Sequence, residues 1–104
     1  MSAEADARAM AEALWPGCIV RMDTRTRHEL PEYCVVVAAP GLPERPSHKW
    51  RPTVAWAWND AWYSLHMAVQ TRIAELRREG DSTADARARL EALIIPVSLR
   101  EDCP

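Results

Sequence analysis

Histidine and cysteine, the side chains that most often act as nucleophiles, bases and metal ligands, are few and scattered in this sequence. The six are His28, His48, His66, Cys18, Cys34 and Cys103. Their spacings match no metal-binding motif, and the motifs of phosphate loops, serine nucleophiles and zinc proteases are absent. One reactive pair stays open, because a strand carrying Cys34 and a helix carrying His66 can face each other. Apart from that pair, the residues predict a non-enzymatic protein without catalytic residues, metal ligands or a cofactor.

Arg21, Arg25 and Arg27 have the spacing that best fits contact with phosphate groups. They alternate along a predicted strand and therefore share one face, and strands bind DNA grooves in some proteins. Asp23, Glu29 and Glu32 lie nearby, and the net charge of −2 provides no overall attraction to nucleic acid. Two interpretations follow: a DNA- or RNA-binding face, or an ordinary solvated strand face.

Residues 40–52, PGLPERPSHKWRP, form a predicted connecting loop, because their four prolines cannot continue a helix or a central strand. The loop combines basic and aromatic side chains, and Trp and Arg are enriched among residues that dominate binding energy between proteins. Its candidate contact residues are Arg45, His48, Lys49, Trp50 and Arg51. Pro43 and Pro46 also match the bare PxxP pattern of ligands for proline-binding domains.

The elements that position these side chains begin with a predicted helix over 3–14, capped by Ser2 and ended by the Trp15-Pro16-Gly17 sequence. Alternating polar and apolar residues then predict a strand over 18–27, and a run rich in β-branched residues predicts a second strand over 33–39, with a polar turn between them. A third strand is predicted over 53–58, where the bulky residues fall on one face. These bulky residues are Val54, Trp56 and Trp58.

A long helix is predicted to begin at Asn59 or Asp60 as its cap and to end at Glu79, before Gly80. Its core stripe is Trp62, Leu65, Val69, Ile73 and Leu76. A second apolar flank contains Tyr63, Met67 and Ala74. Either the last helix, predicted over 82–94, packs on this flank, or the flank is exposed and serves dimerisation or a partner.

Together these elements predict a single α+β domain over residues 1–104 in the order α-β-β-β-α-α. The predicted sheet is three-stranded and antiparallel, with an N-terminal helix and two C-terminal helices. The N-terminal segment is acidic and has no long apolar run, so we expect no signal peptide, no membrane partner and a cytoplasmic location.

The α-β-β-β-α order over roughly the first eighty residues resembles the double-stranded-RNA-binding domain, in which a lysine cluster at the start of the last helix grips phosphate. Here residues 59–63 read NDAWY, which is acidic and aromatic. The same order, the small size and the Ala- and Arg-rich composition also resemble small phage and mobile-element accessory proteins, among them anti-CRISPR proteins.

The second resemblance implies a non-enzymatic inhibitor that occludes a surface of a protein or ribonucleoprotein complex, such as a bacterial defence nuclease, in the host cytoplasm. One alternative is a small DNA- or RNA-binding regulator that uses Arg21, Arg25 and Arg27. Another is an enzyme with an unfamiliar site.

Overall fold

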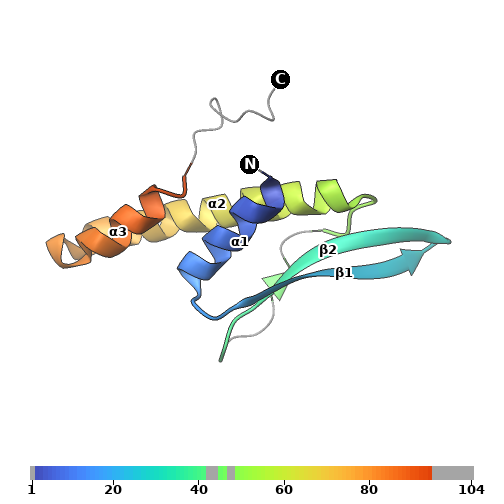
Figure 1. Cartoon of the computed structure of the whole chain (residues 1–104), viewed down its shortest axis with the longest axis horizontal. Coiled ribbons are helices and arrows are strands. Elements are labelled where there is room, and N and C mark those ends of the chain that lie inside the picture. Colours follow the sequence, from blue (N-terminus) through green and yellow to red (C-terminus); the bar gives the residue numbers. More distant parts are fainter. Residues whose placement is uncertain (1, 42–44, 47–48, 95–104) are drawn as a thin grey trace, which may run out of the picture.

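The structure is a computed structural model that describes residues 2–41, 45–46 and 49–94. Its elements are α1 (Ala3–Leu14), β1 (Ile19–Arg27), β2 (Leu30–Ala38), β3 (Arg45–Pro46), α2 (Val54–Glu79), the 3-10 helix η1 (Asp81–Thr83) and α3 (Ala84–Glu91). The class is α+β as predicted, and the long α2 helix lies over a hairpin of β1 and β2 (Figure 1).

Helix α1 has the predicted bounds and the predicted cap. The Ser2 hydroxyl accepts a hydrogen bond of 3.1 Å from the backbone N–H of Ala5, which satisfies one of the free donors of the first turn. The helix buries Ala7, Met10 and Ala11. The small alanines allow α1 to pack closely against α2, with which it shares the core.

The predicted three-stranded sheet with a strand over 53–58 is wrong, because residues 54–58 form the first turns of α2 and the two long strands of the sheet are β1 and β2. The helix is capped by Thr53, whose Oγ1 accepts a hydrogen bond of 3.1 Å from the N–H of Trp56. The predicted cap at Asn59 or Asp60 is therefore also wrong, since both residues lie within the helix.

Packing explains why this segment is helical. Ala57 and Trp58 are buried and continue, at helical spacing, the buried positions Ala61, Trp62 and Leu65. Over so short a window, an alternating pattern and a helical pattern are indistinguishable by residue type. Contact with the rest of the core therefore decides the conformation, and it overrides the strand preference of Val and Trp.

The hairpin is longer than predicted, since β2 begins at Leu30 and the strands pair from Ile19 opposite Ala38 to Arg27 opposite Leu30. Only His28 and Glu29 form the turn, with φ of 53° and 65°. A two-residue turn with both φ angles positive has a twist that matches the strands it joins. The hairpin tip consequently projects past the start of α2 (Figure 1).

The sheet consists of these two long strands and the two-residue β3, which pairs with β2 at Val36 and Val37. The predicted loop over 40–52 therefore contains a short paired segment. Further along, the backbone of Arg51 forms an isolated bridge with Tyr33. Strand β2 is thus hydrogen-bonded on both sides, whereas β1 is an edge strand.

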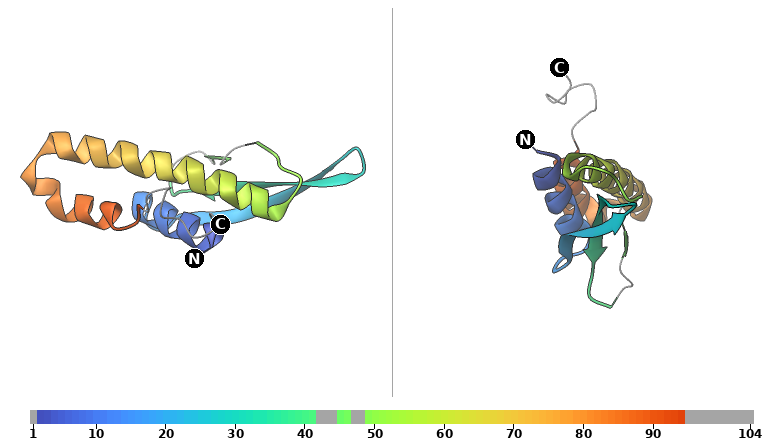
Figure 2. Two further views of the ribbon diagram at one scale, coloured as in Figure 1. Left: turned by 90° about the horizontal axis from the view of Figure 1, so that it is seen from above. Right: turned by 90° about the vertical axis from the view of Figure 1, so that its right-hand side faces the viewer.

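One face of the hairpin packs on the helices. Val35 and Val37 of β2 are buried in the same core cluster as Trp58, Trp62 and Leu65 of α2. Side chains alternate along a strand, so Cys34 and Val36 lie on the other face. The helices α1 and α3 both lie along one side of α2 (Figure 2).

The C-terminal helix is shorter than predicted, because η1 and α3 end at Glu91. The Thr83 hydroxyl lies 2.8 Å from the carbonyl oxygens of Leu76 and of Gly80, and thus bonds to backbone at the C-terminal end of α2. It therefore does not cap α3. Leu90 anchors α3 in the core.

Candidate protein-contact surface

The side of α2 that points away from the core carries a line of apolar side chains. Trp56, Tyr63 and Met67 are 46%, 52% and 61% exposed, and the half-buried Ala74 extends the line. Intervals of seven, four and seven positions place the four residues on one side of the helix. We call these four residues the outward stripe.

The buried positions of α2 lie on its opposite side. They are Ala57, Trp58, Ala61, Trp62, Leu65, His66, Val69, Ile73 and Leu76. Helix α3 packs against this buried side, which leaves the predicted second flank open. Of the two alternatives for Tyr63 and Met67, the structure shows the exposed one. A helix that is apolar on two opposite sides is typical of one that packs against a further element.

Trp56 is held in place from the segment that precedes the helix. The guanidinium of Arg51 lies 4.8 Å from the centre of the Trp56 ring, a cation–π contact. Arg51 Nε also donates to a carboxylate oxygen of Asp60, and both side chains are mostly buried. The backbone of Arg51 pairs with Tyr33 through hydrogen bonds of 2.7 and 2.8 Å. Arg51 therefore ties β2 to the start of α2 and fixes one face of the Trp56 ring.

Tyr63 is supported by buried rings. Its ring meets that of Trp62 edge-on, with 4.9 Å between the centroids and 87° between the planes. Trp62 in turn stacks on the buried His66 at 4.7 Å. Restrained side chains lose little conformational entropy on binding, so Trp56 and Tyr63 suit a preformed contact surface.

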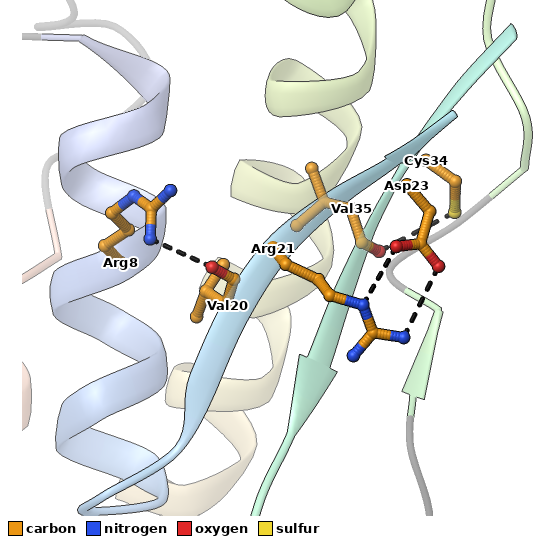
Figure 3. Close-up of polar contacts among 6 residues, drawn as sticks. All are labelled: Arg8, Val20, Arg21, Asp23, Cys34 and Val35. Atoms are coloured by element: carbon orange, nitrogen blue, oxygen red, sulfur yellow. Dashed lines mark hydrogen bonds and ion pairs between the residues drawn. The ribbon is translucent and has the colours of Figure 1, made fainter.

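The outer face of the hairpin carries the arginines predicted for nucleic acid, and carboxylates neutralise two of them. Arg21 Nε donates to Asp23 Oδ1 at 2.9 Å, next to Cys34 (Figure 3). Arg25 Nε donates to Glu32 Oε1 at 2.8 Å. Only for Arg27 does the described part of the chain provide no ion pair. The face therefore offers phosphate much less free positive charge than its residue types suggest.

Trp50 and Arg25 belong to different predicted sites, and the structure brings them together. The Arg25 guanidinium lies 4.4 Å from the centre of the Trp50 ring. Lys49 beside them is exposed, whereas Arg51 is engaged with Asp60 on the α2 side of the sheet. Among the remaining predicted loop residues, Arg45 is described only as part of β3, and His48 lies outside the described residues.

Trp56 is the exposed aromatic residue of α2 that the sequence alone did not place on this surface. With residues 53–58 assigned to a strand, Trp56 shared a face with Trp58, which is in fact buried. The signal was present, because Trp56 precedes Tyr63 by seven positions, two turns of a helix. Extending the helix back to a Thr53 cap would have placed both rings on one flank.

Cys34 and His66 do not form the nucleophile pair that the sequence left undecided, because they lie on different sides of the hairpin. Cys34 lies on the hairpin face opposite the helices, where its Sγ is 3.6 Å from the carbonyl oxygen of Val35 (Figure 3). His66 lies in α2, stacked on Trp62. Within the described residues, no group of three or more His, Cys, Asp or Glu side chains is arranged to hold a metal ion.

Cys18, at the start of the hairpin, has a thiol that resists ionisation. Partial burial is the main cause that raises its pKa, and the nearby Glu12 carboxylate raises it further. Glu12 is held there by accepting a hydrogen bond of 3.1 Å from the N–H of Gly17. A raised pKa leaves little thiolate at neutral pH, which is the opposite of an activated cysteine.

Two hollows flank α3, and neither resembles a reaction site. One, of about 390 Å³, lies between α2 and α3, where Arg77 and Glu91 form an ion pair of 2.8 Å on its rim. The other, of about 370 Å³, lies where the end of α1 meets α2 and α3. Exposed charged side chains line both hollows together with apolar ones, whereas the exposed side chains of the outward stripe are apolar, so the stripe remains the strongest candidate surface.

Among the described helices, none combines the length and the apolar character needed to cross a membrane. In comparisons with protein-family models, curated proteins and solved structures, no match to this chain was found.

Proposed function

We propose that this chain is a non-enzymatic binding protein whose contact surface is the outward stripe of α2. The observation that supports the proposal is the exposure of Trp56, Tyr63 and Met67 along one side of a helix whose other side forms the core. Large restrained aromatic side chains beside a flexible Met are typical of surfaces that bind other proteins.

The chemistry of the stripe favours protein over nucleic acid as the partner. Its exposed side chains are apolar, and the hairpin arginines Arg21 and Arg25 are paired with carboxylates. Phosphate contacts require free positive charge, whereas an aromatic stripe gains affinity from removing apolar surface from water.

The test places a photoreactive benzoylphenylalanine at Tyr63 and exposes the chain to a nuclease-treated bacterial lysate at high salt. We expect a discrete crosslinked product that disappears when Met67→Glu is added. The matched control carries the photoreactive group at the exposed Ala9 of α1, away from the stripe. Equal products from both positions, or none from Tyr63, would contradict the proposal.

The narrower form of the proposal is inhibition of a bacterial defence nuclease complex by occlusion. Its test compares target cleavage by such a complex in the presence of the wild-type chain and of the Met67→Glu variant. Inhibition that depends on Met67 supports occlusion through the stripe. Equal cleavage with and without the wild-type chain excludes that complex as the target.

A further inference from the structure

The outward stripe has the residue spacing of a helix that packs against another helix. Trp56, Tyr63, Met67 and Ala74 recur at intervals of seven and four, the spacing of a seam between paired helices. The seam lies on the side of α2 opposite its core, so a second helix can reach it without disturbing the fold.

The two ends of the stripe differ in chemistry. The N-terminal end presents the exposed ring of Trp56 with the Asp60 carboxylate one turn away. The C-terminal end presents Arg77 and Arg78. Arg77 is paired with Glu91 of α3, whereas Arg78 is exposed and has no ion pair within the described residues.

Met67 lies midway between these ends, with Trp56 eleven positions before it and Arg78 eleven positions after it. If two copies of α2 pack antiparallel about a two-fold axis at Met67, Arg78 of each copy faces Trp56 of the other. Arg51 covers one face of the Trp56 ring at 4.8 Å, so the exposed remainder of the ring is open to a second guanidinium. A parallel arrangement would instead place Arg78 against Arg78 and lose this complementarity.

We propose that the occupant of the outward stripe is a second copy of this chain, packed through antiparallel α2 helices with Met67 at the two-fold axis. This inference rests on the proposed function and names a second copy as the partner; occlusion of a nuclease complex through the same stripe is then excluded, because the dimer buries it. The two-fold axis makes the surface complementary to itself, with apolar contacts at the centre and Arg78–Trp56 contacts at both ends. The hairpins then project at opposite ends of the dimer, because each extends past the start of its own α2 (Figure 1).

The first test is the mass of the full chain by sedimentation equilibrium over a micromolar to millimolar series. We expect the mass to approach twice the 11.8 kDa of the chain. Met67→Glu brings two carboxylates together at the axis and should weaken dimerisation by about tenfold or more. Arg78→Glu should weaken it by a smaller factor, about threefold to tenfold, through the lost contacts with Trp56. The control Ala9→Glu adds the same charge elsewhere and should leave the dissociation constant unchanged.

The second test fixes the direction of packing by oxidative crosslinking in a background that carries Cys18→Ser and Cys103→Ser. Met67→Cys should form a disulfide-linked dimer, because position 67 meets itself at the axis. Ala74→Cys should not, because antiparallel packing separates the two copies of position 74 by about 21 Å along the helix axis. Equal crosslinking at both positions would indicate parallel helices and overturn the proposed arrangement.

A wild-type chain that sediments as a monomer throughout the series would overturn the second copy as the occupant. In that case, a crosslinked product between Tyr63 and a different protein in lysate would leave the proposed function standing. A monomer that also forms no product through Tyr63 would overturn both. The circular dichroism spectrum of Met67→Glu serves as the folding check, since Met67 is 61% exposed and its replacement should leave the helix intact.

Discussion

The outward stripe of α2 and the outer face of the hairpin are both exposed, but their side chains are satisfied in different ways. On the hairpin, Arg21 and Arg25 find carboxylates within the same sheet, and Trp50 lies under Arg25. On α2, Tyr63 and Met67 extend into solvent. Residue type alone therefore misleads: the arginines of the hairpin face are largely paired within the sheet, whereas the stripe keeps large apolar side chains exposed to solvent.

Side chains also protect the edge strand of the hairpin against pairing with a further strand. Arg8 of α1 donates a hydrogen bond of 3.0 Å to the carbonyl oxygen of Val20 on the edge strand β1 (Figure 3). Charged residues along β1 further disfavour the addition of another strand. Contact through the sheet edge is therefore less favourable than contact through α2.

Asp60→Ala removes the support of the N-terminal end of the stripe and should have a larger effect on stability than any change on the hairpin face. This change leaves the mostly buried guanidinium of Arg51 without its carboxylate, which should lower the free energy of unfolding by about 1–3 kcal/mol. Urea denaturation followed by circular dichroism measures the loss. The control is Glu75→Ala, which removes an exposed carboxylate of α2 and should cost less than about 0.5 kcal/mol. Equal effects of the two variants would mean that Arg51 does not tie β2 to α2.

On the hairpin face, Arg25→Ala should have a smaller effect. It removes an exposed ion pair with Glu32 and a cation–π contact with Trp50, together about 0.5–1 kcal/mol of unfolding free energy. Combined with Glu32→Gln, so that the lost arginine leaves no free carboxylate, the variant should leave any affinity for duplex DNA at low salt unchanged, because the pair already offers no net charge to phosphate. A fall in DNA affinity, measured by fluorescence anisotropy with Arg8→Ala as the control, would restore the nucleic-acid interpretation of this face.

A change in thiol reactivity should be the smallest of these effects. It is measured in a Cys103→Ser background, so that Cys18 and Cys34 are the thiols that remain. Cys34 is 2% exposed and should resist a thiol reagent, whereas half-buried Cys18 should react slowly at neutral pH and faster as the pH rises. Glu12→Gln removes the carboxylate that raises the Cys18 pKa, so it should increase the reaction rate at pH 8 by about twofold.

The glutamine amide oxygen introduced by this substitution can still accept the hydrogen bond from the N–H of Gly17, which keeps the local structure. A rate unchanged by Glu12→Gln would mean that burial alone holds the thiol protonated. The pH dependence of stability has a definite sign. The raised pKa favours the neutral thiol in the fold, so its contribution is complete below the thiol's unfolded pKa and is lost as the pH rises through the folded value.

Local signals in the sequence determined several elements of this protein. The Ser2 cap and the Trp15-Pro16-Gly17 sequence bound α1, and Gly80, with φ of 91°, follows the last residue of α2. Alternation along β1 correctly separates Val20 and Met22, which pack on the core, from the arginine face. Each of these outcomes depends on neighbours in sequence, through capping, backbone freedom or strand periodicity.

Tertiary contacts determined the features for which local sequence patterns allowed more than one outcome. Residues 53–58 fit both a strand and a helix, and burial of Trp58 in the shared core made them helical. The position of α3 determined that Tyr63 and Met67 are exposed, and the path of the chain brought Arg51 to Asp60 and Arg25 to Trp50. The spacing of residues in the sequence indicates which of them share a face of a helix or strand. Which segment covers that face depends on the free energy of contacts between distant segments, and a local pattern gives no information about those contacts.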